Sequence, residues 1–171
     1  MRPQAKRIGE LFYEDELQKG WVQEGRDLRL AAASRLGLEH VQMIIARSAE
    51  FPAIERAIRA AGIDLMTCVS EVGEPWKQDL IRFLVRSRIP FDSHVDRVMN
   101  GGGLIGTYPS WSEAYRDAFG IVAQILRGAN PASIPVRTPT RFHTAINLRT
   151  ARAMGLTIPS SILLRADEVL E

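Results

Sequence analysis

The stretch from Arg7 to Ala46, RIGELFYEDELQKGWVQEGRDLRLAAASRLGLEHVQMIIA, decides the fold. The short apolar run Arg7–Tyr13 predicts a strand, and the long amphipathic segment behind it predicts a helix that ends at Gly37. The run 40–46 is almost wholly apolar, which is typical of a strand that is covered on both faces of a sheet. A strand, a helix and a second buried strand in succession favour parallel pairing. We expect the helix to bury one face, made of Leu17, Trp21, Leu28 and Ala32.

The same alternation continues along the chain as far as Gly128. Strands predicted by apolar runs span 63–70, 89–93 and 101–108, and the predicted helices are 48–62, 76–88 and 110–128. In the last of these helices, Ser110 and Glu113 have the spacing of a capping box. Strands that alternate with helices throughout predict an α/β fold, in which a doubly wound, mostly parallel sheet of five strands has helices on both faces.

The pattern changes after Gly128. Pro131, Pro135 and Pro139 indicate a stiff, extended connector. A strand over 142–146 follows, then a helix that Asn147 caps, and a last helix over 160–170. We therefore expect two parts, an α/β lobe over residues 1–136 and a C-terminal crossover segment over 137–171.

Composition narrows the class of protein. The chain has 171 residues, 46% of them hydrophobic and 25% charged, which is ordinary for one globular domain and excludes a disordered chain. Its 22 basic and 20 acidic residues are mixed along the predicted helix faces, so a nucleic-acid-binding surface is not expected. No apolar run approaches the ~20 residues that span a bilayer, and the first residues do not resemble a signal peptide.

The sequence offers few groups for catalysis or metal binding. The segment Gly101–Gly106, GGGLIG, matches the dinucleotide pattern literally, but it precedes a predicted strand instead of following one, so we expect a turn with positive φ angles. The three histidines lack the spacing of metal ligands, and no metal or other cofactor is predicted. Cys68 and His94, at the ends of neighbouring predicted strands, form the one candidate thiol–imidazole pair.

Ligands of an open parallel sheet bind at the carboxyl ends of its strands. The residues at these ends include Tyr13, Glu14 and Asp15 after the first strand and Arg47 and Ser48 after the second. Each of them is an ordinary loop residue by itself, and together they form a candidate rim for a ligand site.

The last 47 residues carry a more specific signal. The segment ILRGANPASIPVRTPTRFHTAINLRTARAMGLTIPSSILLRADEVLE (Ile125–Glu171) resembles the C-terminal end of a family of ABC-transporter substrate-binding proteins that includes tryptophan-binding and other aromatic-amino-acid-binding members. Upstream, GGLIGTYPSWSEAYRDAF is similar to a segment of the same family. Such proteins have two α/β lobes hinged around a ligand cleft, and their chains run to roughly twice this length. The resemblance implies that this chain corresponds to the second lobe of a type I periplasmic-binding-protein-like fold, followed by its crossover tail.

The resemblance also implies a function and a set of cleft residues. We expect non-covalent binding of a small solute such as an amino acid, no enzymatic activity, and a cleft lined by Tyr13, Glu14, Ser70, Ser93 and Tyr108. Two departures bear on the solute: the loop after the first strand is acidic and lacks the family's Asn-Pro-like pair, and the family's Tyr-Gly is Tyr108–Pro109 here. Carboxylates that face the cleft disfavour the carboxylate of an amino acid.

The expected partners are those of an importer. They are the solute, the ABC permease subunits, and either a first lobe that this truncated chain lacks or a second copy bound through the tail. The resemblance implies a periplasmic location, although we find no export signal in the chain. The alternative is a small stand-alone α/β enzyme that uses Cys68 and His94. Apolar residues of the tail after Pro135 are expected to lack cover within this chain, and so to promote self-association.

Overall fold

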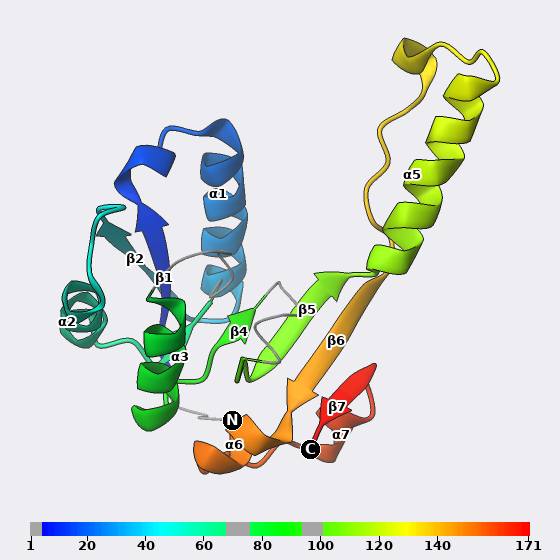
Figure 1. Ribbon diagram of the computed structural model, residues 1–171. Helices are drawn as coiled ribbons and strands as arrows, with labels where there is room; N and C mark the ends of the chain where they lie inside the picture. Colours follow the sequence, from blue (N-terminus) through cyan, green and yellow to red (C-terminus); the bar gives the residue numbers. More distant parts are fainter. Residues whose placement is uncertain (1–4, 68–75, 94–100) are drawn as a thin grey trace.

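A computed structural model describes residues 5–67, 76–93 and 101–171. Strand β1 (Arg7–Tyr13) pairs along its whole length with the parallel strand β2 (Glu39–Ile45), and on its other side with β3 (Leu65–Met66). Helix α1 (Gly20–Arg35) connects β1 to β2 (Figure 1). The predicted first strand is confirmed at both ends, and the second is shifted by one residue.

The sheet continues beyond β3. Strand β4 (Asp92–Ser93) pairs in parallel with β5 (Ile105–Pro109), and a parallel bridge between Met66 and Phe91 connects this group to β3. The strands therefore form two sheets, one in the order β2-β1-β3 and one that begins with β4-β5, and this single bridge joins them edge to edge. This confirms an α/β fold with a parallel sheet.

The C-terminal tail adds two more strands to the second sheet. Strand β6 (Phe142–Asn147) is antiparallel to β5, and β7 (Glu168–Leu170) is parallel to β6. The helix predicted over 160–170 is wrong beyond its first turn, because α7 spans only Ser160–Leu163 and the chain then extends into β7. The reason is a contact distant in sequence, in which the Asp167 carboxylate accepts the Thr144 N–H at 2.8 Å.

The main core lies between the sheet and helices α2 (Phe51–Ala61) and α3 (Lys77–Arg86). The predicted inward residues of α3 are confirmed, since the side chains of Leu80, Phe83 and Leu84 are buried. The predicted face of α1 is wrong at two of its four positions, and the side chain of a third, Trp21, lies outside the described residues. The buried side chains of this helix include Val22 and Ala33, whereas Leu28 is 66% exposed and Ala32 is also exposed.

The tail shares this core. The side chains of Ala151 and Met154, each 1% exposed, belong to the main core cluster, and Leu156 and Ile158 pack against it. Ile146 on β6 is fully buried as well. The expectation that the tail's apolar residues lack cover is therefore wrong for these positions. Helix α6 (Leu148–Ala153) begins as predicted, because Oδ1 of Asn147 accepts the N–H of Thr150 at 3.1 Å.

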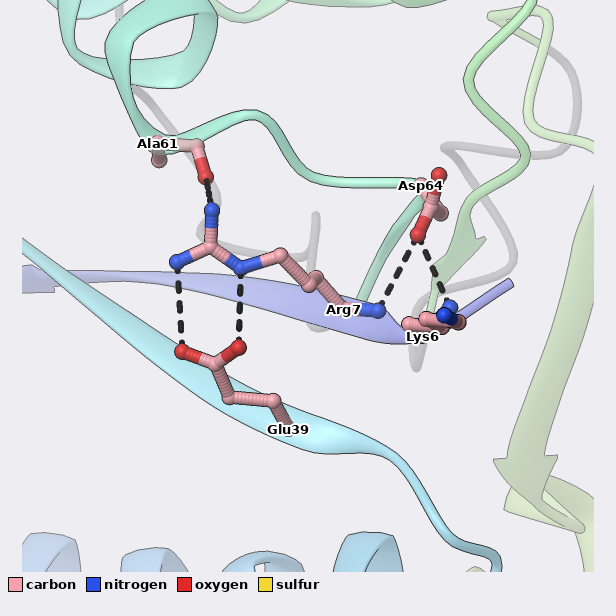
Figure 2. Close-up of polar contacts among 5 residues, drawn as sticks. All are labelled: Lys6, Arg7, Glu39, Ala61 and Asp64. Atoms are coloured by element: carbon pink, nitrogen blue, oxygen red, sulfur yellow. Dashed lines mark hydrogen bonds and ion pairs between the residues drawn. The ribbon is translucent and has the colours of Figure 1, made fainter. Parts of the chain in front are cut away.

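Polar contacts hold the amino end of β1 in place (Figure 2). The guanidinium of Arg7 donates to both carboxylate oxygens of Glu39, at 3.0 and 3.2 Å, and also to the carbonyl of Ala61 at the end of α2. The carboxylate of Asp64 accepts the backbone N–H groups of Lys6 and Arg7 at 2.8 and 3.1 Å. These contacts join β1, β2, α2 and the start of β3 at the amino edge of the sheet. None of the residues involved lies at the opposite, carboxyl edge.

Helix α5 (Trp111–Leu126) projects from the sheet as an arm, and the extended segment 134–141 runs back toward β6 beside it (Figure 1). The predicted capping box at its start is wrong. The Ser110 side chain makes no capping hydrogen bond and lies 3.2 Å from the Ser112 hydroxyl, while Glu113 pairs with Arg141 instead. The glycine turn before β5 has the expected geometry at Gly102, whose φ is 108°.

Candidate functional site

The carboxyl ends of β1 and β2 meet at one edge of the sheet, because the two strands are parallel. β1 ends at Tyr13, and Arg47 follows β2 by two residues. The guanidinium carbon of Arg47 lies 4.1 Å from the centroid of the Tyr13 ring, and the Trp76 ring lies 6.5 Å from that centroid at a tilt of 57°. The Tyr13 side chain is 4% exposed, so Arg47 and Trp76 present the accessible surface here.

Two acidic residues hold Arg47 in this position. Its Nε donates to Asp15 at 3.2 Å and its terminal nitrogen donates to Glu16 at 3.0 Å. The hydrogen bond to Asp15 raises the pKa of Arg47 above its ordinary value, so the cation over Tyr13 is permanent. Ion pairs this exposed contribute little to stability, and their effect is to join the turn after β1 to the end of β2.

A hollow of about 380 Å³ opens beside this cluster, within the range of small-molecule sites. It is lined by Arg47, Ser48, Ala49, Glu50, Phe51, Trp76 and Asp79. Helix α2 begins at Phe51, and this first residue of the helix forms part of the wall of the hollow. Aromatic surface, one fixed cation and two carboxylates suit a small solute that has an apolar part and a polar or charged head group.

The predicted cleft residues do not all come together. Tyr13 and the exposed Glu14 lie at the edge just described. Tyr108 lies on β5, in the other sheet, and belongs to a different buried cluster from Tyr13. Its hydroxyl donates to Glu168 at 3.2 Å and its ring stacks on His143. Ser93 ends β4, and Ser70 lies outside the described residues.

Arg47 belongs to the rim that the sequence predicts, but the predicted cleft includes neither Arg47 nor Trp76. The signal for Arg47 was available: a cation two residues beyond one buried strand faces an acidic turn at the end of its neighbour. Trp76 was expected to point inward, and it is partly buried against the core. The alternative pair, Cys68 and His94, lies outside the described residues.

Other classes of site find no support in the described parts of the chain. No cluster of three metal-ligating side chains occurs within residues 5–67, 76–93 and 101–171. Over the same residues, no helix is long and apolar enough to cross a membrane.

Comparison with solved structures identifies proteins of the same fold. A conserved domain protein from Vibrio cholerae matches with a TM-score of 0.78 at 21% identity, over 98% of this chain and 56% of its own. An ABC domain from Streptococcus pneumonia, solved in complex with L-Trp, matches with a TM-score of 0.77 at 20% identity, over 99% of this chain and 58% of its own. A ligand-free, open substrate-binding protein with adhesive properties from Clostridium difficile gives 0.65 at 18% identity, over 98% and 55%.

This chain therefore spans a little over half the length of the solved proteins that it matches. Comparison with curated protein sequences gives no match. The family described as ABC transporter substrate binding protein matches residues 1–170, which is nearly the whole chain. The chain belongs to the family of ABC transporter substrate-binding proteins.

Proposed function

We propose that this chain is one lobe of the solute-binding component of an ABC-type importer, and that it binds a small solute such as an amino acid without covalent chemistry. The observation that carries the proposal is the hollow at the carboxyl edge, where Arg47 and Trp76 flank the buried ring of Tyr13. Family membership and the share of the solved proteins that the chain covers support it.

In this proposal the solute lies in a cleft between this lobe and a second one. Residues 1–136 form the lobe, which is doubly wound, and 137–171 form the crossover segment that follows it. The pairing of β5 with β6 joins the two parts in one sheet. Two lobes that close on a solute bury far more of its surface than one lobe does. The location is periplasmic, and the permease subunits are the further partners.

The proposed contact residues are Tyr13, Glu14, Ser70, Ser93 and Tyr108, to which the geometry adds Arg47 and Trp76. Asp15 and Glu16 already engage Arg47, so its charge is largely balanced within the chain. Glu14, Glu50 and Asp79 add negative charge around the hollow. A solute with an amino group and an apolar or aromatic side chain therefore fits better than a free carboxylate would.

The test is a titration of the chain with a panel of amino acids, followed by calorimetry and by amide chemical shifts. One lobe leaves the solute half solvated, so we expect dissociation constants weaker than about 100 μM, with the shift changes gathered at the ends of β1 and β2 and the start of α2. Trp76→Ala should weaken binding, because the apolar part of the solute would lose the aromatic surface of the hollow. Trp111→Ala is the matched control, because Trp111 is also an accessible tryptophan at the start of a helix but lies on the arm.

Shift changes gathered elsewhere, or equal effects of the two substitutions, would contradict the proposed site. Tight binding by the chain alone would show that the site needs no second lobe.

A further inference from the structure

The guanidinium of Arg47 lines the hollow and is already bound by two carboxylates of the chain itself. Its Nε donates to Oδ2 of Asp15 at 3.2 Å, and its Nη2 donates to Oε1 of Glu16 at 3.0 Å. The two acids belong to the turn after β1, whereas Arg47 follows β2, so the contacts span 32 and 31 residues of sequence. The fold therefore brings these carboxylates to a cation that a solute would otherwise meet.

Arg7 shows what the same two nitrogen atoms do when a single carboxylate approaches them. Its Nε and Nη2 donate to the two carboxylate oxygens of Glu39, at 3.0 and 3.2 Å (Figure 2). This bidentate fork is the arrangement by which arginine recognises a carboxylate. In Arg47 the same pair of nitrogens is divided between Asp15 and Glu16. A solute carboxylate therefore cannot enter the fork of Arg47 without displacing them.

The charges of this cluster are also balanced. The guanidinium carbon of Arg47 lies 4.1 Å from the centroid of the Tyr13 ring, so the ring covers one face of the cation. Lys19 donates to the same carboxylate oxygen of Glu16 at 3.0 Å. Arg47 and Lys19 thus offset the charges of Asp15 and Glu16, and the cluster as a whole offers no excess positive charge to an anion.

The other charged side chains of the hollow are acidic. Asp79 is paired with Arg82, whereas the exposed Glu50 has no ion-pair partner within the described residues. Phe51 and Trp76 supply aromatic surface beside them. An amine with an apolar side group finds both an acid and a hydrophobic wall here. A carboxylate meets an occupied guanidinium and an unbalanced negative charge.

We propose that Asp15 and Glu16 determine which head group the site accepts, because they act as tethered competitors for Arg47. A carboxylate held in the chain competes at an effective concentration far above that of a free solute. The site therefore selects a primary amine that bears an aromatic or branched apolar group and has no carboxylate, and it rejects the corresponding acid. This inference rests on the proposed function, since it assigns the solute class of the same hollow.

The experiment titrates the full chain with three probes that share a phenyl ring and differ in their head groups: phenethylamine, phenylpropionate and phenylalanine. Amide chemical shifts report where each probe binds and give its dissociation constant. In the wild-type chain, phenethylamine should bind at least about tenfold more tightly than phenylpropionate. In the double variant Asp15→Ala, Glu16→Ala the fork is open, and phenylpropionate should gain at least about tenfold in affinity, because its hydrogen bonds to the guanidinium are charge-assisted.

The arm supplies a matched control. Glu113 and Asp117 are also acids that pair with exposed arginines, Arg141 and Arg137, but they lie on α5. The double variant Glu113→Ala, Asp117→Ala removes the same charge and should leave the order of the three probes unchanged. Exposed pairs contribute little to stability, so both double variants should remain folded, which circular dichroism checks.

A substitution of Arg47 separates the open fork from the general effect of charge. Removal of two acids makes the hollow less negative, which by itself favours any anion. Arg47→Lys in the Asp15→Ala, Glu16→Ala background keeps the positive charge but lacks the planar fork, so most of the gain for phenylpropionate should be lost. A gain that survives this substitution unchanged would overturn the proposal.

Acetate provides a test that needs no apolar solute. It should shift the Nε–H resonance of Arg47 in the Asp15→Ala, Glu16→Ala variant and leave that resonance unchanged in the wild-type chain. An equal shift in both would show that the two acids do not block the fork, and would overturn the proposal.

The two proposals fail in different ways. Probes that bind at the ends of β1 and β2 in the same order of affinity, in the wild-type chain and in the double variant, contradict the role of Asp15 and Glu16 alone. Failure of all three probes to bind there contradicts the proposed function and this solute class with it.

Discussion

Nε2 of His40 lies 3.0 Å from Oε2 of Glu10, and both side chains are almost completely buried, at 1% and 3% exposure. Nε of Arg29 donates to the same oxygen of Glu10 at 2.9 Å and lies 2.8 Å from the other one, so α1 is bonded to the middle of β1. A buried carboxylate is tolerated only when it is paired in this way, because its desolvation is costly. This relationship also explains why α1 turns the face of Val22 and Arg29 toward the sheet and not that of Leu28.

The first prediction follows from this pair. Glu10→Ala leaves His40 and Arg29 without their acceptor, and should lower the free energy of unfolding by about 3–5 kcal/mol in urea denaturation. Glu55→Ala is the comparison, since it removes an exposed i,i+4 pair with Arg59 and should cost about 0.5 kcal/mol or less. Similar losses of unfolding free energy for the two variants would show that the buried Glu10 pair is no more costly to break than an exposed pair.

A second prediction concerns the close packing behind β1. A Cβ added at Gly9 would lie 2.7 Å from Cδ1 of Ile63 and 2.9 Å from Cε of Met43, so Gly9→Ala should cost about 1–3 kcal/mol. Gly120→Ala, in the interior of α5 with open space around it, should instead stabilise the chain by up to about 1 kcal/mol. Thermal unfolding of both variants measures the sign, and a neutral Gly9→Ala would mean that Ile63 and Met43 adjust freely.

Two asparagine caps give a third, internally controlled comparison. Asn147 caps α6 from a buried position, and Asn130 makes an equivalent bond of 3.1 Å to the N–H of Ala132 in an exposed turn. Asn147→Ala should cost about 1–2 kcal/mol, because a buried N–H of Thr150 loses its acceptor, while Asn130→Ala should cost only a few tenths. Chemical denaturation tests this, and an equal cost would show that water replaces the cap at both sites.

Tyr108 allows a fourth prediction that separates a structural role from a binding role. Its hydroxyl connects β5 to Glu168 of β7, so Tyr108→Phe should lower the unfolding free energy by about 0.5–1.5 kcal/mol and speed amide exchange in β7. If Tyr108 also contacts solute as proposed, the same variant weakens amino-acid binding. Unchanged affinity together with faster exchange would show that Tyr108 stabilises β7 and does not contact the solute.

Local patterns in the sequence were sufficient for the elements whose environment is simple. β1 is a continuous apolar run, and Asn147 caps a helix through a bond to the third residue beyond it, so both follow from neighbouring residues alone. The strand β7 could not be predicted in this way. Residues 167–170 have the composition of a helix end, and they extend because Asp167 bonds to the backbone of Thr144, 23 residues away.

The candidate site, like the fold, could be predicted from the sequence only in part. The acidic turn after β1 and the cation after β2 are visible in the sequence, but their meeting depends on the register that places Tyr13 opposite Ile45. The stacking of Arg47 on a buried tyrosine, with Trp76 beside it, is a product of three separate segments. Periodicity cannot report such a contact, so the choice of cleft residues from the sequence included Tyr13 and missed both of its neighbours.

Strands β5 and β6 are adjacent and antiparallel, and their last register pair joins Pro109 to Phe142. In topological terms, everything between them, α5 and its return, is the loop of a hairpin. Each doubling of the length of a flexible loop costs only about 0.6 kcal/mol in closure entropy, so the sheet places little constraint on what this loop carries. The surface of the arm can therefore change, by substitution or by replacement of the whole arm, without disturbing the register of β5 and β6. Variation of the arm is thereby separable from variation at the carboxyl ends of β1 and β2, where the candidate site lies.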